Sequence, residues 1–343
     1  MGGTPYTADK LANIQLSRGL EGKGFYGVST SSFSCDIYTE YPLPESAVIE
    51  FSGLMGYEFT LAEQSHSVNV ASITAYDCCK NLDLPFDYSG YTQFDSDGKA
   101  IWYAASLIIN GIAHQCGFKS AANVSARMAK LCYNDFAGKS CRQILTDLSN
   151  VNVGFWYDSG GVLNFRAFSP SVSGFSVADR DRAEIRVLGK KTISGIFAED
   201  EIYGTDYSTG SPWQNTERLS GRYLTTELVQ QLTGQILGDG GSYDYFGWEC
   251  SHILTSAVYN IGDCIAYEGD DLPVLNAEFE FTAMGIIANL SSPAPDNSFS
   301  EYQDLYSRKI EGKVAYDRVL GCTVTTQDGF GLVRSAKAVV NSG

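Results

Sequence analysis

A change of hydrophobic period near residue 76 constrains the fold of this chain more than any other feature. From Phe33 to Ile37, apolar residues alternate with the polar Ser34 and Asp36, and this pattern predicts a half-buried strand. Residues 101–114 are instead rich in helix formers and are apolar on more than one side, which predicts a buried helix. The chain is therefore expected to insert a helical block between two β regions.

The first β region is expected over residues 1–75. Short strands are predicted at 33–41, 48–51, 57–61 and 68–75. Pro42 and Pro44 close the first of these, because proline cannot donate a hydrogen bond to a neighbouring strand.

The helical block is expected over residues 76–149. Its first helix, 101–114, is predicted to end near Gly117, since glycine is common just beyond helix ends. Ser140 is a suitable N-cap for a second helix. The apolar stripe of that helix consists of Ile144, Leu145 and Leu148.

β structure is expected to return after residue 150. Residues 153–168 predict a hairpin about Gly160 and Gly161, because glycine tolerates the positive φ of a tight turn. Further predicted elements are strands at 184–188, 192–198 and 276–284, a helix at 223–237, a linker at 291–300, and a hairpin at 322–334 that turns at Asp328-Gly329.

Four domains follow from this order. Residues 1–75, completed by 150–183, are expected to form a first β-barrel, and 76–149 a helical insertion. Residues 184–290 are expected to form a second β-barrel domain. Residues 291–343 are expected to be a linker and a C-terminal tail that docks on a partner or on the body of the protein.

The charge of the chain limits the partners it can bind. The net charge is −16, and residues 190–310 contain 18 Asp or Glu but only 6 Lys or Arg. Tight binding of a phosphate backbone requires clustered Lys and Arg. The excess of acids indicates either a surface that serves solubility or one that nucleic acid passes without sticking.

The cysteines and the apolar segments indicate a cytosolic origin. Nine cysteines occur without any Cys-x-x-Cys spacing, so we expect buried free thiols rather than a disulfide framework or a zinc site. No signal-like start and no apolar run of about 18 residues is present. The chain is expected not to insert into a membrane.

Two loop motifs resemble ligand-binding sequences. Residues 22–27 have the Gly-x-Gly-x-x-Gly spacing of dinucleotide-binding loops, but the residues after them read as a strand, so no helix N-terminus would face the phosphates. Residues 95–98, Asp-Ser-Asp-Gly, resemble part of a calcium loop but lack its later acidic ligands. The favoured interpretation is a strand-connecting turn for residues 22–27 and a polar turn for residues 95–98.

No catalytic, cofactor-binding or metal-ligating set is predicted. Glu199 and Asp270 each begin an acidic run, but neighbouring residues of a strand point to opposite faces and make poor glycosidase pairs. His114 lies in the apolar helix and is expected to be a core histidine, and its helix position does not suit a nucleophile pair with Cys116. The chain is therefore expected not to be an enzyme.

The order of these elements resembles that of the hub proteins of phage tails and baseplates. The resemblance runs from about Asn13 to Leu290. Its segments are the opening strands 13–20 and 33–41, the start of the helical block at Ile73-Thr-Ala-Tyr-Asp77, the helix and hairpin 141–148 and 154–168, and the turn and strand 261–265.

The resemblance implies an α+β, β-dominated fold with two small barrels similar to tail-tube subunits. It implies a structural homotrimer in a virion or a phage-tail-like particle assembled in the host cytoplasm. As partners it implies a tail tube or distal tail protein, a central spike, surrounding baseplate proteins, and DNA that passes without specific binding. Two alternatives stay open, a particle-associated cell-wall hydrolase and a carbohydrate-binding β protein.

Overall fold

A computed structural model describes most of the first 294 residues and two short strands near the C-terminus. The described residues are 6–21, 26–45, 47–50, 58–122, 130–168, 175–176, 182–200, 205–210, 216–221, 230, 234, 237, 241–255, 258–283, 285–294, 322–325 and 335–338. The chain forms two compact units, residues 1–295 and 296–343.

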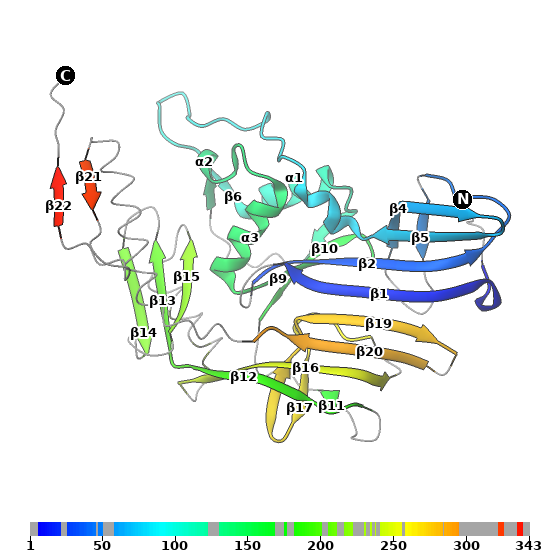
Figure 1. Ribbon diagram of the computed structural model, residues 1–343. Coiled ribbons are helices and arrows are strands. Elements are labelled where there is room, and N and C mark those ends of the chain that lie inside the picture. Colours follow the sequence, from blue (N-terminus) through cyan, green and yellow to red (C-terminus); the bar gives the residue numbers. More distant parts are fainter. Residues whose placement is uncertain are drawn as a thin grey trace. The chain divides into compact units, whose positions relative to one another are not determined.

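One long antiparallel sheet organises the first unit (Figure 1). Its strands in spatial order are β12 (Arg186–Ile193), β16 (Tyr243–Thr255), β20 (Gly285–Ser292), β19 (Asn276–Thr282), β1 (Leu11–Glu21), β2 (Gly27–Tyr38), β5 (Val70–Tyr76), β4 (Glu58–Ser67) and β3 (Val48–Glu50). Strand β1 pairs with β2 on one side and with β19 on the other. The N-terminal and C-terminal strand blocks therefore share one sheet.

A hairpin extends this sheet toward the helical block. It consists of β9 (Gly154–Ser159) and β10 (Val162–Ala167), and β9 starts parallel to β2 at Gly27 and Val28. Strand β7 (Ser120–Ala122) adds to β10 in parallel. Gly160 and Gly161, at the turn, have φ values of 64° and 76°, which confirms the predicted hairpin and the need for glycine there.

The helices gather at the end of β2 that carries β9 and β10 (Figure 1). They are η2 (Cys78–Asp83), α1 (Ala105–Gln115), α2 (Tyr133–Phe136) and α3 (Cys141–Asn152), and a short 3-10 turn, η1 (Ala8–Lys10), precedes β1. Strands β6 (Trp102–Ala104) and β8 (Lys130–Cys132) pair beside them. Ser140 and Gln143 form the expected cap of α3, donating to each other at 3.0 and 3.2 Å.

Three small sheets complete the described structure. The first consists of β11 (Phe175–Ser176), β17 (Cys264–Tyr267) and β18 (Asp270–Pro273), and the second of β13 (Gly195–Asp200), β14 (Thr205–Gly210) and β15 (Thr216–Gly221). In the second unit, β21 (Cys322–Thr325) and β22 (Ser335–Ala338) pair antiparallel, and the predicted turn at Asp328 lies outside the described residues.

Two apolar cores stabilise the first unit. One lies against the long sheet and contains Phe33, Phe59, Trp248 and Phe279. The other fills the helical block and contains residues of α1 and α3 together with Trp156. Full burial of a large apolar side chain contributes roughly 1.5 to 3 kcal/mol, so the sheet and the helical block each have a substantial core.

The β-dominated α+β class is confirmed, but the described strands form no closed barrel. The pairing of Leu16 with both Phe33 and Phe279 joins the two strand blocks that were expected to form separate barrels. The predicted strand 184–188 overlaps the start of β12, which extends to Ile193. The predicted strand 192–198 covers the end of β12 and most of β13. Most of the predicted helix 223–237 lies outside the described residues. Among the described helices, none is long and apolar enough to cross a bilayer.

The expectation for His114 was wrong. The core face of α1 carries Ala105, Ile108, Ile109 and Ile112, whereas His114 is exposed. Residue 114 follows Leu107 by seven positions, which is two helical turns, and Leu107 is also exposed. The helix is thus buried on one side only, and its last turn presents the histidine to solvent.

Candidate functional site: the polar face of the sheet

The face of the long sheet opposite its apolar core is a continuous polar surface. The strand register places Thr74, Ser34, Gln15 and Glu280 in one row across β5, β2, β1 and β19. The next row contains Ser32, Ser17, Glu278 and Asn289. Because side chains alternate along a strand, the residues between them, such as Leu16 and Phe33, enter the core.

The charge of this polar face is predominantly negative. Glu278 and Glu280 are exposed along β19. Arg186, on the edge strand β12, donates to Glu249 on β16 at 3.1 Å. Hydroxyl and amide groups fill the space between the carboxylates. A surface of this composition accepts hydrogen bonds and repels phosphate groups.

A β-bulge in β1 shapes one part of the polar face. Asn13 has a φ of 52° and interrupts the register between Ala12 and Gln15, a conformation that asparagine tolerates better than most residues. Its amide donates to Asp36 at 2.6 Å. Hydrogen bonds from Ser72 and Asn13 lower the pKa of Asp36, so this carboxyl group stays ionised.

Two shallow grooves lie on the polar face. One, of about 680 Å³, is bordered by Glu184, Arg186, Glu249, Glu278 and Asn289. The other, of about 380 Å³, lies over β1, β2, β4 and β5 between Gln15 and Glu63. Their borders combine many polar residues with a few apolar ones, such as Leu290 and Ile73, and contain no aromatic side chain. This composition differs from the apolar and aromatic lining typical of small-molecule sites.

Two buried carboxyl groups lie at the junction of the sheet and the helical block. Asp77, which caps η2, accepts hydrogen bonds from the backbone of Ser31 at 2.8 Å and Cys79 at 3.1 Å. Asp158, in the hairpin, accepts from the backbone of Cys78 at 3.0 Å and Gly161 at 2.8 Å. Burial and the charge of Asp158 raise the pKa of Asp77 to about 7.

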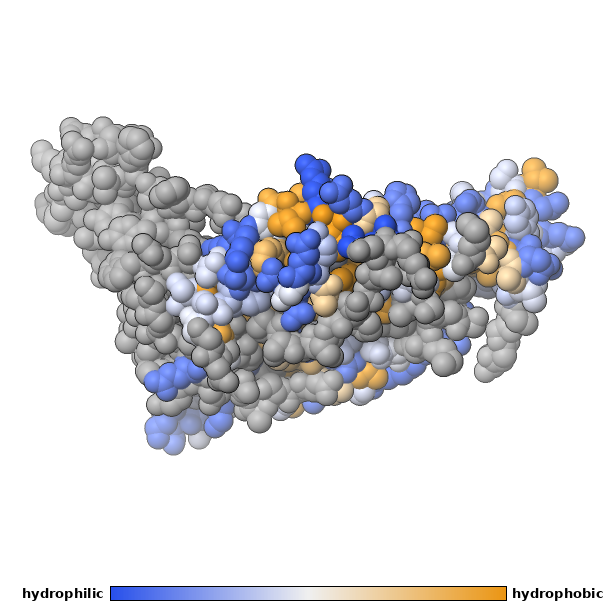
Figure 2. Space-filling view, turned by 90° about the horizontal axis from the view of Figure 1, so that it is seen from below, coloured by the Kyte–Doolittle hydropathy of each residue, from blue (hydrophilic) through white to orange (hydrophobic). Residues whose placement is uncertain are grey.

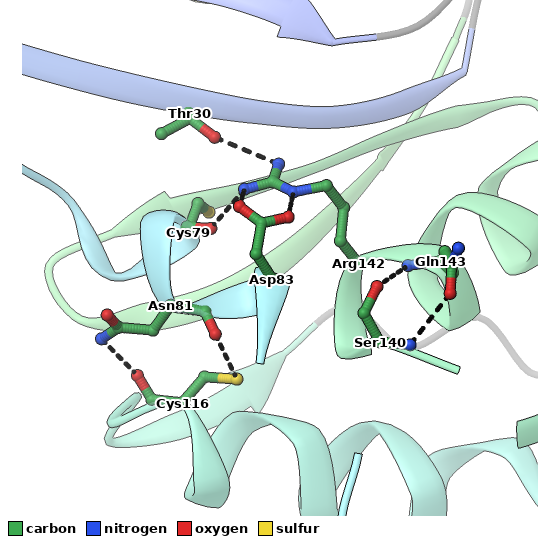
Figure 3. A network of polar contacts seen from close by, with 8 residues as sticks. All are labelled: Thr30, Cys79, Asn81, Asp83, Cys116, Ser140, Arg142 and Gln143. Atoms are coloured by element: carbon green, nitrogen blue, oxygen red, sulfur yellow. Dashed lines mark hydrogen bonds and ion pairs between the residues drawn. The ribbon is translucent and has the colours of Figure 1, made fainter. Parts of the chain in front are cut away.

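An arginine of α3 ties the helical block to the sheet (Figure 3). Arg142 binds Asp83 at 2.7 and 3.3 Å, and it also donates to the carbonyl of Cys79 at 2.8 Å and to the hydroxyl of Thr30 at 3.3 Å. This planar fork joins α3, η2 and β2. The cap of α3 by Ser140 immediately precedes it, so the first turn of α3 is held at several points.

The structure describes one of the two loop motifs in full. Residues 22–25 of the first motif lie outside the described residues, but β1 before them and β2 after them pair antiparallel, so a strand rather than a helix follows the motif. The carboxylate of Asp95 accepts from the backbone of Asp97 and Lys99, both at 2.9 Å. Those contacts form a polar turn, as expected.

The acidic runs that were weighed as catalytic pairs belong to different sheets. Glu199 lies in β13 and Asp270 in β18. Asp270 and Asp271 are exposed, and the side chain of Glu199 lies outside the described residues. The ring of His66 forms a hydrogen bond with the carbonyl of Thr39 at 3.1 Å.

The eight cysteines whose side chains the structure describes are free thiols, and most are buried. Cys116 and Cys141 lie against each other in the core of the helical block. The thiol of Cys116 also donates to the carbonyl of Asn81 at 3.4 Å. These positions agree with the expectation that the cysteines act as small apolar residues.

Part of this surface was predictable from the sequence, and the rest was not. The alternation around Ser34 and Asp36 predicted one polar strand face, and the alternation at 276–284 predicted another. These two strands, β2 and β19, lie on either side of β1, so Gln15 and Ser17 are between them. This neighbourhood follows only from the pairing of β1 with β19. The hydrogen bond from the backbone of Cys78, next to Asp77, to Asp158 also joins segments that are distant in the sequence.

The fold is similar to that of solved phage tail proteins. No protein-family model matches the sequence, and no curated protein matches it. Prophage tail protein gp18 from Listeria monocytogenes EGD-e superposes with a TM-score of 0.54 at 14% identity, over 90% of this chain and 94% of that chain. The 43 kDa tail protein of prophage MuSo2 from Shewanella oneidensis superposes with a TM-score of 0.50 at 13% identity, over 86% and 96%.

A tail protein from Neisseria meningitidis MC58 gives a TM-score of 0.48 at 12% identity, over 81% of this chain and 91% of that chain. The superpositions on the first two structures cover most of this chain and nearly all of the other chain. At these identities the likeness concerns the fold. The chain has a fold found in phage tail proteins.

Proposed function

We propose that this chain is a structural protein of a phage tail or a related particle, and that it acts there as a trimeric hub between a six-fold tail tube and a three-fold spike. The observation that carries the proposal is the likeness to tail protein gp18, which extends over 90% of this chain. The order of strands, helical block and strands supports the same reading.

The polar face of the long sheet is suited to line the channel of such a hub. This face carries mainly hydroxyl and carboxylate groups and few cationic side chains that could bind a passing phosphate backbone. Asp36 stays ionised because its pKa is lowered. Strong backbone binding requires several Lys or Arg contacts, each contributing to affinity. DNA would therefore pass this face without sticking.

The edges of the long sheet are suited to contacts between copies. Among the described strands, β12 and β3 each have a single neighbour, so each has a side that presents backbone donors and acceptors. Val187 and Leu188 on β12 and Val48 on β3 are also exposed. Contact with a neighbouring copy would cover such edges and close the open sheet into a tube-like ring.

The helical block is suited to contacts with surrounding proteins. The exposed large apolar residues in the described part of this block are Leu84, Tyr88, Phe94, Trp102 and Leu107. Exposed aromatic residues are enriched at protein interfaces, so we place neighbouring tail or baseplate proteins at the helical block. Figure 2 shows the molecule from below the view of Figure 1, the side on which β12, β16 and β17 lie, and hydrophobic residues reach the surface between hydrophilic ones there too.

The experiment that tests the proposal is a count of copies in the assembled particle. Particles purified from lysates should contain this chain, and their reconstructed density should show three copies at one axial level. Six copies at that level would contradict the hub role but keep a tail role. Absence of the chain from particles that are otherwise complete would contradict both.

The hydrolase alternative makes a separate prediction. Purified protein incubated with labelled cell wall should release no fragments. Release that disappears in Glu199→Ala or Asp270→Ala, but persists in the polar-turn variant Asp97→Ala, would identify an enzyme and overturn the structural role.

A further inference from the structure

A small pocket of mixed polar and apolar lining lies where three distant parts of the first unit meet. Its volume is about 140 Å³, and its walls come from β1, β2, the hairpin of β9 and β10, and the turn at residues 260–261. A single buried water needs only about 10 to 15 Å³ of such volume. The pocket therefore has room for a group of several heavy atoms.

Two guanidinium groups line this pocket. Arg18 is only 4% exposed and donates through Nη1 to the amide oxygen of Asn260 at 2.8 Å. Arg166 donates through Nη1 to Asp263 at 2.8 Å and to the carbonyl of Ile261 at 3.2 Å. A guanidinium carries five N–H donors in a rigid fork, so it can serve a protein acceptor and an oxyanion together.

The other walls of the pocket add neutral donors. Ser29, Ser31, Ser159 and Tyr157, which all carry a hydroxyl group, also line the pocket, together with Phe155 and Ile261. Side chains with hydroxyl or guanidinium groups commonly bind oxyanions. Burial strengthens such contacts, because the local dielectric is lower than that of water.

One carboxyl group, that of Asp158, also lines the pocket, but its oxygens are engaged by its own surroundings. One oxygen accepts from the backbone of Cys78 and the other from the backbone of Gly161. Burial raises the pKa of Asp158, and the hydrogen bonds from the backbone of Cys78 and Gly161 oppose that shift. The partner of Arg166, Asp263, is itself held by the backbone of Asn260 at 2.8 Å.

We propose that this pocket is a binding site for a small oxyanion, held between the guanidinium groups of Arg18 and Arg166. The ligand class is a phosphate or carboxylate group. It would come either from free inorganic phosphate or from an acidic side chain of a partner protein. Because Arg18, Arg166 and Asn260 belong to separate strand blocks, the bound anion would join those blocks.

Equilibrium dialysis of the full-length protein against radiolabelled inorganic phosphate, at constant ionic strength, tests this site. We expect one equivalent per chain with a dissociation constant of about 1 mM or tighter. Arg166→Lys keeps a positive charge opposite Asp263 but loses the fork, and it should weaken binding at least about fivefold. Arg186→Lys, which changes an exposed arginine of the polar face, should leave binding unchanged.

A competition arm distinguishes the two sources of the ligand. Acetate that displaces phosphate at a similar concentration would identify a carboxylate site, and failure to displace it would identify a phosphate site. Should Arg166→Lys not fold, Ser159→Ala supplies the comparison, with an expected loss of about twofold to threefold from one hydroxyl group. No saturable binding up to about 10 mM, or equal binding by native protein and the folded pocket variant, would overturn the proposal.

Discussion

Replacing Asp77 with asparagine should remove a pH dependence that we expect in the stability of the native protein. Burial, followed by the charge of Asp158, raises the pKa of Asp77 in the folded protein from 3.8 to about 7. Between these two values the folded chain keeps a proton that the unfolded chain has released. The stabilisation is therefore complete below the unfolded pKa and is lost as the pH rises through the folded pKa.

The size of the effect follows from the width of that window. One pH unit corresponds to about 1.4 kcal/mol per proton, so a window of roughly three units gives an upper bound of about 4 kcal/mol. The backbone N–H groups of Ser31 and Cys79 favour the ionised carboxylate, and the pKa of about 7 already includes their opposing effect. In Asp77→Asn, one of these two donors loses its acceptor, at a cost of about 1 to 3 kcal/mol.

The native protein should therefore be more stable than Asp77→Asn near pH 5, and the difference should shrink or reverse near pH 8. Urea unfolding at several pH values measures this difference. Asp36→Asn is a matched control, because hydrogen bonds from Ser72 and Asn13 lower the pKa of Asp36 and place its titration below the window. If the native protein and Asp77→Asn lose stability in parallel, Asp77 is ionised throughout and the reasoning fails.

Three further predictions concern single positions. Ser140→Ala removes the cap of α3 and should lower the free energy of unfolding by about 1 kcal/mol, with a fall in denaturant midpoint as the readout. Val68→Asn should raise stability by about 1 kcal/mol in the same assay, because Val68 is exposed in a hairpin turn with a φ of 44° that suits asparagine better than valine; a lower midpoint would contradict the strain. Glu280→Lys should strengthen duplex DNA binding and steepen its salt dependence by about one unit of slope, whereas Asp97→Lys, in the exposed polar turn, should have a smaller effect; equal effects of the two changes would argue against the polar face as the DNA-facing surface.

Local structure was predictable wherever neighbouring residues determine it. The alternation at Phe33, Cys35 and Ile37 correctly predicted one buried strand face. Ser140 and Gln143 are three positions apart, the spacing of a reciprocal cap, and they form one. These signals act within one turn or one strand, so the sequence alone reveals them.

Structure that depends on distant pairing was not predictable in the same way. The hydrophobic pattern of β1 shows that Leu16 lies on the buried face of the strand, but not that Phe279 is its neighbour. His114 was misjudged because a helix that is apolar on several sides can still leave its last turn in solvent. The pocket between Arg18 and Arg166 has no local signature, since its walls come from three separate segments.

The central position of β1 has a consequence for folding during synthesis. One edge of β1 can pair with β2 as soon as the first forty residues have emerged, but its other edge pairs with β19, where Ile14 meets Phe281. At typical synthesis rates that edge stays open for roughly 15 to 50 s. An open strand edge invites pairing with another chain, so neighbouring nascent copies would compete with β19 for β1, and such pairings of high contact order are slow to form. We expect the yield of correctly folded protein to depend on the local concentration of nascent chains.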